Sequence, residues 1–234
     1  GAFARQAAAD ARRITVRQRV SFVRLPEAGY KPRAYHPGSG AYSHAFFDFA
    51  QPIDRNLEVR LQPRFRLEKT DPAAARSRVK KPIVFYLDRG TPEPIRSALR
   101  EGANWWKAAF ESAGYIDAFR AELAPEGMSM SDVRYNTITW THRATRGWSY
   151  GGGLVDPRTG EIIKGYVNLG SQRVRQDLLI AEGLLAPHRP GADPALMEEA
   201  KRMALDRLKQ LSAHEVGHAL GFAHNFAASR TGEG

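Results

Sequence analysis

Hydrophobic and polar residues alternate along two stretches in the first third of the chain, residues 14–25 and residues 57–68. A period of two is typical of a strand that is buried on one face. We therefore expect a strand in each stretch, and Pro63 implies that the second is an edge strand or is broken there. The Gly- and Pro-rich residues between them predict a loop. Residues 71–82 are polar and predict a linker, so we place a domain boundary near Lys81.

After Lys81 the pattern becomes regular. A helical period follows Thr91, which we expect to cap a helix with Pro92 at its first position and an end at Gly114. Short runs rich in apolar and β-branched residues predict three strands: residues 82–87, 119–123 and 133–140.

A Gly-rich stretch at residues 150–155 is followed by turn residues at 156–160 and by a further apolar stretch at 161–169. The chemistry of the turn predicts that the two flanking stretches pair as a β-hairpin. Residues 171–192 are expected to form a loop or a short helix.

A long helix is predicted next. Asp193 is expected to cap it, with Pro194 at its first position and an apolar stripe that continues to Leu220. The order strand, helix, strands, long helix predicts an α+β fold with a mostly antiparallel or mixed sheet.

Composition limits the classes of protein that fit this pattern. The chain has 234 residues, of which 42% are hydrophobic, and this share supports a packed core and excludes wholesale disorder. No apolar run approaches the roughly 20 residues that cross a bilayer, and the first residues lack the apolar centre of a signal peptide. We therefore expect no transmembrane segment in this chain.

The formal net charge of +10 lies entirely in the first third of the chain. Residues 1–81 contain 17 Lys and Arg against 7 Asp and Glu, whereas residues 82–234 contain 18 of each. Such a segment fits either a surface for nucleic acid, another anionic polymer or membrane headgroups, or a solvated β-rich segment. The second interpretation is favoured because no nucleic-acid-binding motif is present, and we expect no nucleic-acid partner.

The chain has no cysteine, so any metal must be held by histidine and carboxylate side chains. Residues 214–224 read HEVGHALGFAH, and we call this segment the motif. Positions i and i+4 share one face of a helix, so the imidazoles of His214 and His218 can approach one ion. Gly221 permits a sharp turn that would bring His224 back as a third ligand.

Three neutral imidazole nitrogens leave a fourth tetrahedral position for water, which is the arrangement of a catalytic zinc site. Glu215 is placed to touch that water without binding the ion, and it can act as a general base. The alternative is a histidine-rich helix end whose imidazoles are satisfied inside the core. Polar groups within an apolar stripe cost stability unless they are paired, and this favours the Zn²⁺ site.

A resemblance to a family is carried by the motif together with residues 134–185, which begin RYNTITW and include WSYGGGLVDPRTG. These residues resemble the bacterial zinc-dependent metalloproteases of the Met-zincin family, a metzincin-like family of the cell envelope. The resemblance covers about residues 80–230, and residues 12–81 resemble the end of the preceding domain. It implies a β-rich basic segment at 1–81 and a metzincin-like catalytic subdomain at 82–234.

The resemblance also implies the fold and the roles of the site. The fold would be a zincin-like subdomain with a mixed sheet, mostly parallel with an antiparallel edge strand, a backing helix and a long active-site helix. The function would be that of a zinc metalloendopeptidase acting on a peptide or protein substrate, in a periplasmic or secreted location. The implied zinc ligands are His214, His218 and His224, and the implied catalytic base is Glu215. The implied substrate-binding edge strand contains Gly151, Gly152, Gly153 and Leu154.

One departure from the family concerns methionine. The family continues to a Met-turn beneath the zinc, yet all four methionines of this chain precede the motif. We therefore expect an internal fragment, truncated before the Met-turn and lacking one wall of the specificity pocket. An alternative function is a catalytically silent zincin remnant whose basic β-rich module binds an anionic polymer.

Weaker candidates have structural alternatives that we favour or weigh equally. His142 is either a substrate contact or a strand-end histidine with a structural partner. Tyr150 either stabilises an oxyanion or is packed. Asp156 and Asn168 either bind a second cation or serve the turn and the strand.

Three aromatic residues recur at helical spacing in the first predicted helix: Trp105, Trp106 and Phe110. An apolar stripe at this period commonly faces a core. We expect all three to pack against the sheet.

Overall fold

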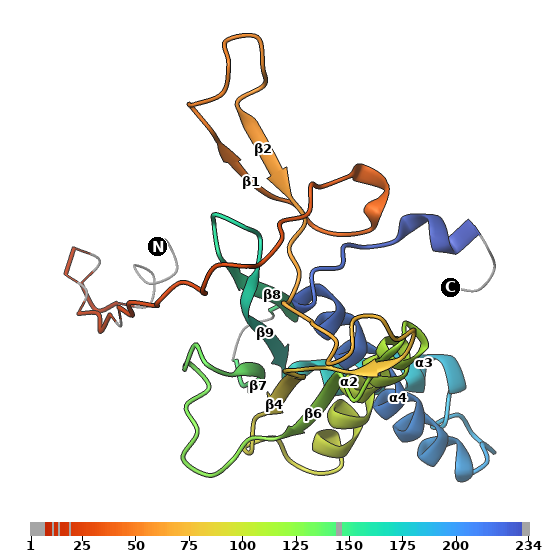
Figure 1. Cartoon of the computed structure of the whole chain (residues 1–234). Coiled ribbons are helices and arrows are strands. Elements are labelled where there is room, and N and C mark those ends of the chain that lie inside the picture. Colours follow the sequence, from red (N-terminus) through yellow and green to blue (C-terminus); the bar gives the residue numbers. More distant parts are fainter. Residues whose placement is uncertain (1–7, 11, 14, 19, 144–146, 231–234) are drawn as a thin grey trace.

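The computed structural model describes residues 8–10, 12–13, 15–18, 20–143 and 147–230 (Figure 1). Its α-helices are α2 (Ile95–Ser112), α3 (Gln172–Leu185) and α4 (Ala195–Ala219), and its 3₁₀ helices are Pro37–Ser39 and Phe226–Arg230. Its strands are β1 (His44–Phe47), β2 (Glu58–Leu61), β3 (Ser77–Arg78), β4 (Ile83–Leu87), β5 (Tyr115–Ile116), β6 (Phe119–Leu123), β7 (Asn136–Thr141), β8 (Tyr150–Val155) and β9 (Ile162–Gly170).

The main sheet has five strands in the order β6-β4-β7-β9-β8. Strands β6, β4, β7 and β9 are parallel, and β8 joins β9 as an antiparallel edge strand. The predicted α+β fold is therefore confirmed, with a mixed sheet that is mostly parallel. The predicted hairpin is confirmed as well, because β8 and β9 pair through the turn at residues 156–160.

The core lies between this sheet and the helices. Alternate residues of β4, namely Ile83, Phe85 and Leu87, are buried and share one apolar cluster with Leu99 of α2 and Leu208 of α4. Alternate side chains of a strand lie on one face of the sheet, and the apolar side chains of a helix lie along one stripe. The buried face of the sheet and the apolar stripes of the helices therefore pack together in one core layer. The long helix α4 is thereby fixed along the sheet (Figure 1).

Two hydrogen bonds tie the end of α4 to α2. The Ser212 hydroxyl donates to the Leu99 carbonyl at 2.7 Å, in a fully buried position. The Trp106 indole Nε1 donates to the Ala213 carbonyl at 2.8 Å. Both acceptors are backbone atoms, so the bonds set the position of the helix itself. The residue that follows Ala213 is the first histidine of the motif.

Helix α2 begins later than the sequence predicts. Its first residue is Ile95, and Thr91 is a fully buried residue that does not cap it. The Thr91 carbonyl instead accepts from Arg96 Nε at 2.9 Å. The predicted end at Gly114 is confirmed within two residues, since the helix ends at Ser112. The predicted long helix is also confirmed, and the Asp193 carboxylate accepts from the Ala195 N–H at its start.

The strand predicted at 14–25 is wrong for the residues of that range that the structure describes. They form an extended coil in which Val20 and Phe22 are 66% and 99% exposed. Alternation indicates a strand only where a partner strand pairs with it, and no strand pairs with the described residues of this stretch. Of the stretch 57–68, four residues form β2, which pairs with β1 in the projecting hairpin of Figure 1 and ends before Pro63.

The basic segment contacts the rest of the molecule at several points. Ala41 forms an antiparallel bridge with Phe222, and Arg64 forms a parallel bridge with Glu161. The Arg66 guanidinium forms a 2.7 Å ion pair with the Glu161 carboxylate. The domain boundary near Lys81 stays a prediction. In the described part of the chain, no helix combines the length and apolar character needed to span a membrane.

Candidate metal centre

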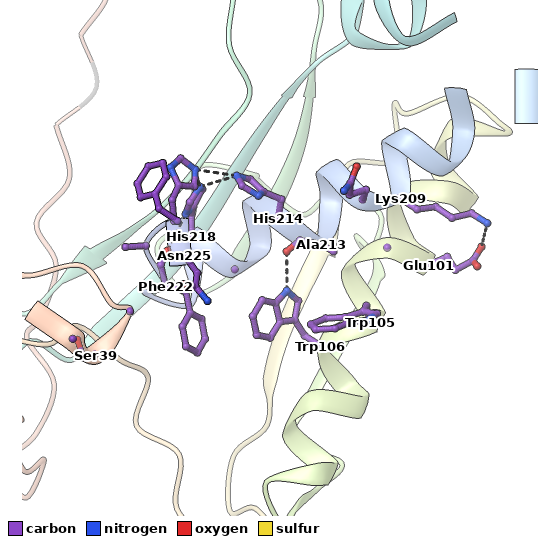
Figure 2. A pocket seen from close by; sticks show the side chains of 18 residues that line it. Ser39, Glu101, Trp105, Trp106, Lys209, Ala213, His214, His218, Phe222 and Asn225 are labelled. Atoms are coloured by element: carbon purple, nitrogen blue, oxygen red, sulfur yellow. Dashed lines mark hydrogen bonds and ion pairs between the residues drawn. The ribbon is translucent and has the colours of Figure 1, made fainter. Parts of the chain in front are cut away.

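The motif forms the last turns of α4 and the turn that follows it. The three imidazoles point at one another, with Nε2–Nε2 distances of 3.0 Å between His214 and His218, 3.0 Å between His218 and His224, and 3.2 Å between His224 and His214 (Figure 2). Ligands at 2.0–2.1 Å in a tetrahedral site are about 3.3 Å apart, so the three nitrogens are spaced as one small cation requires. The predicted convergence of the three histidines is therefore observed.

Gly221 produces the turn that returns the chain. Its φ is +102°, and a Cβ at this position would lie 2.6 Å from the Pro63 carbonyl oxygen. Only glycine combines that backbone angle with so close a neighbour. The turn is closed by hydrogen bonds from the Gly221 N–H to the His218 carbonyl and from the Phe222 N–H to the Gly217 carbonyl, both at 3.0 Å. This turn places His224 opposite the helix face.

The protonation of His218 follows from its neighbours. Its Nδ1 lies 2.8 Å from the Phe222 carbonyl oxygen, which can only accept a hydrogen bond, so Nδ1 carries the proton. The Nε2 atom is then unprotonated and directs its lone pair toward the other two imidazoles. The pKa of His214 is lowered by burial and by His218 and His224, which favours the neutral form. Neutral imidazoles are the form that binds a metal.

Glu215 lies on the sheet side of the helix and is 5% exposed. Burial raises the pKa of its carboxyl group, and a backbone hydrogen bond from Gly151 acts in the opposite direction. The carboxylate does not line the cleft described below. It borders a smaller pocket of about 120 Å³ formed with residues 147–149 and Arg173. Glu215 is therefore beside the histidine cluster, held against β8, and separate from the three nitrogens.

Strand β8 runs along the motif as the outermost strand of the sheet. At Gly151 a Cβ would lie only 1.8 Å from the Glu215 carbonyl oxygen, so glycine is needed there for strand and helix to touch. Gly152 and Gly153 face side chains of β9, and Leu154 is 41% exposed. The four residues predicted to contact substrate thus lie at the sheet edge. Their role in substrate binding stays a prediction.

A cleft of about 1180 Å³ opens beside the cluster, between α2 and α4, and all three histidines line it (Figure 2). Its walls are aromatic, and the rings of Trp106 and Phe222 are stacked at 5.2 Å. One end carries the ion pair between Lys209 and Glu101 at 3.1 Å. The remaining aromatic lining residues are Trp105 and Phe226.

This cleft corrects one prediction about the aromatic residues of α2. Trp105 is 61% exposed and is not part of the core as expected. Trp106 packs on the core cluster as expected, but it faces α4 rather than packing against the sheet. Phe110 does so, because its ring stacks on Phe119 of β6 at 5.9 Å. Successive residues of a helix are 100° apart, and two adjacent indoles cannot share one face.

The weaker candidates have structural partners. His142 Nδ1 lies 3.0 Å from the Ser171 hydroxyl, and Asn168 donates to the Thr141 hydroxyl at 2.9 Å. The Asp156 carboxylate accepts from the backbone and side chain of Arg158, which lowers its pKa and closes the turn between β8 and β9. Tyr150 is 47% exposed and lies beside Tyr166. His142, Asp156 and Asn168 therefore have the structural partners of the favoured alternative, whereas Tyr150 is half exposed and both interpretations of it stay predictions.

One neighbour of the histidine cluster is not predicted from the sequence. The Tyr42 hydroxyl lies 3.0 Å from His218 Nδ1, and Gly38, Ser39 and Gly40 line the cleft. These residues belong to the loop predicted between the first two strands. Burial and the nearby Glu215 raise the pKa of Tyr42, so its phenol is neutral at ordinary pH.

Two regions of the chain match family models. Residues 196–233, which include the motif, match a family described as Met-zincin. Residues 2–70 match a domain of unknown function (DUF5117). No curated protein and no solved structure matches the chain. The chain therefore contains a metzincin-like region at its motif and a second, different family region in its basic segment.

Proposed function

We propose that the chain carries the catalytic site of a zinc-dependent metalloendopeptidase, with His214, His218 and His224 as the zinc ligands. The observation that carries the proposal is the convergence of their three Nε2 atoms within 3.0–3.2 Å. With Nδ1 protonated, His218 directs the lone pair of Nε2 at the other two imidazoles, and imidazole is a preferred zinc ligand. The Met-zincin match over the same residues supports the proposal.

A bound zinc ion would lower the pKa of a coordinated water to about 7 and polarise the scissile carbonyl. Glu215 accepts a proton from the attacking water as the oxygen bonds to the carbonyl carbon. It then delivers that proton to the leaving amine as the carbon–nitrogen bond breaks. The Gly151 backbone N–H favours the charged form of the carboxyl group that accepts the proton, because it lowers the pKa of Glu215 against the effect of burial.

Strand β8 is the proposed site of substrate binding. An extended peptide can pair with the free side of an edge strand through its backbone, which gives affinity without dependence on sequence. Alternate residues among Gly152, Gly153 and Leu154 would supply the strand groups, while Gly151 is occupied by its contact with α4. A peptide or protein substrate fits this surface, and a periplasmic or secreted location is the matching expectation.

Zinc content after dialysis tests the site. We expect about one zinc per wild-type chain and little in His218→Ala, because two of the three nitrogens cannot hold the ion alone. His188→Ala is the matched control, since His188 is an exposed histidine outside the cluster. Equal zinc in His218→Ala and wild type would contradict the assignment.

Hydrolysis tests the base. In a protein that contains this chain and cleaves peptides, Glu215→Gln should keep its zinc and lose at least about 100-fold in kcat. Glu198→Gln, a change on the exposed side of the same helix, is the control. Hydrolysis by Glu215→Gln at the wild-type rate would remove Glu215 from the mechanism.

The second candidate is a catalytically silent site beside a module that binds an anionic polymer, and its support is the charge of residues 1–81. Several of those cations have internal partners. Arg66 pairs with Glu161, Arg78 with Asp117 and Lys80 with Glu68. The proposal of a peptidase is therefore the stronger of the two.

A further inference from the structure

The loop that crosses the end of the motif is built into the candidate metal centre. We call residues 38–42 the strap. It runs antiparallel to residues 221–223, with Ala41 opposite Phe222. Two backbone hydrogen bonds of 2.9 Å hold the pair together, from the Tyr42 N–H to the Gly221 carbonyl and from the Ala223 N–H to the Gly40 carbonyl.

The strap thereby fixes two oxygen atoms beside His218. One is the Phe222 carbonyl oxygen, which lies 2.8 Å from Nδ1 and belongs to the backbone that the strap pairs with. The other is the Tyr42 hydroxyl oxygen, which lies 3.0 Å from the same nitrogen. The rings of Tyr42 and His218 are also in contact, with centroids 5.6 Å apart.

The chemistry of these groups assigns the direction of the bonds. Because the carbonyl oxygen accepts, the Nδ1 proton is shared between it and the Tyr42 oxygen, and the hydroxyl acts as a second acceptor. Acceptors on the far nitrogen of a histidine fix its tautomer and ring orientation and make the other nitrogen a stronger ligand. The other nitrogen is Nε2, which points into the cluster.

We propose that Tyr42 is a positioning residue of the metal centre, acting through His218, and that the basic segment is thus a working part of the site. The hydroxyl of Tyr42 holds the His218 ring in the tautomer and orientation that direct Nε2 at the ion. This inference rests on the proposed zinc site. It assigns to the region that matches the domain of unknown function a role in metal binding by the metzincin-like region.

Zinc affinity of Tyr42→Phe tests the inference. The variant removes the hydroxyl and keeps the ring that packs on His218. We expect zinc binding, measured by competition with a chromogenic chelator, to weaken by about tenfold, the lower end for lost outer partners of metal ligands. Tyr30→Phe is the matched control, because Tyr30 donates to the Arg64 carbonyl in the same segment and does not touch the cluster.

A second measurement separates positioning from stability. In the presence of a chelator, Tyr42→Phe should melt at the wild-type temperature, and only the rise in Tm on adding zinc should be smaller. With Co²⁺ in place of zinc, the visible absorption bands should shift in Tyr42→Phe and not in Tyr30→Phe, because the ring orientation at the ion changes.

The outcomes are distinct. If wild type binds zinc and Tyr42→Phe binds it equally well, the role of Tyr42 is overturned and the zinc site stands. If both Tyr→Phe variants lose affinity equally, the effect belongs to the segment as a whole and the inference is overturned. If wild type itself binds no zinc, the proposed function fails, and this inference fails with it.

Discussion

Strand β8 and the strap both support the motif, and they do so by different physics. At Gly151, β8 comes so close to α4 that a Cβ would lie 1.8 Å from a backbone oxygen. The strap instead uses two backbone hydrogen bonds and the hydroxyl of Tyr42. The first support is steric and admits no larger residue. The second is polar, and single hydrogen bonds can be removed from it by substitution without a steric clash.

This difference predicts which substitutions act through the fold and which act through the metal. Where two backbone segments touch without space, any added side-chain atom must displace the helix or the sheet. A hydrogen bond to one imidazole transmits its loss mainly to that ring. We therefore expect changes at β8 to reduce stability and changes at the strap to reduce metal affinity.

Gly151→Ala should have the largest effect. The added methyl group would overlap the Glu215 carbonyl oxygen, and the neighbouring atom is backbone that cannot rotate away. We expect a loss of about 3 kcal/mol or more in the free energy of unfolding, measured by urea denaturation without metal.

The matched control for this change is Gly153→Ala in the same strand. Its Cβ would lie 3.2 Å from the Ile162 Cγ2 atom, a side-chain atom that can adjust. We expect a loss below about 1 kcal/mol there. Equal losses at the two positions would show that β8 and α4 are not in steric contact at Gly151.

Gly221→Ala should have an intermediate effect, and it should reduce both the stability of the fold and the affinity for zinc. Alanine at a φ of +102° costs about 1–2 kcal/mol, and the methyl group would press on the Pro63 carbonyl at 2.6 Å. We expect a fall in Tm of a few degrees without metal and, because His224 is displaced, a loss of zinc affinity larger than that of Tyr42→Phe.

Gly191→Ala provides the control for backbone strain alone. Gly191 has a φ of +75° with no atom near its Cβ position, and it lies before α4. The Gly191→Ala variant should lose about as much stability from backbone strain as Gly221→Ala does, and it should keep the zinc affinity of the wild type. A Gly221→Ala variant that binds zinc like wild type would mean that the turn does not position His224.

The smallest effect is expected for anionic polymers. Because several cations of the basic segment are paired with internal carboxylates, we expect the chain to elute from heparin at the same salt concentration as from a plain sulfonate resin. Retention on heparin well beyond the sulfonate resin would revive the binding-module function. It would also give the basic segment a role apart from the strap.

The structural features that the sequence predicts correctly are formed by residues that are close together along the chain. The three histidines lie within eleven residues, and one helix plus one glycine turn brings them together. The β8–β9 hairpin is predicted by its turn, where Asp156 accepts from the Arg158 N–H two residues later. In both cases the local backbone rules are sufficient.

The parts that the sequence does not predict depend on distant partners. Tyr42 contacts a histidine 176 residues away, and nothing in its loop marks that contact. The alternation in residues 14–25 meets no partner strand in the described structure. Adjacent Trp105 and Trp106 cannot share a helix face, but only the position of α4 decides which of them is covered.

The 176-residue separation between Tyr42 and His218 also orders the assembly of the site. During synthesis the strap leaves the ribosome long before the motif exists. Closing so long a loop is entropically costly, and contacts of high sequence separation form late in folding. The contact between Tyr42 and His218 is therefore expected to form late, so the His218 ring would reach its final orientation only after most of this chain has folded.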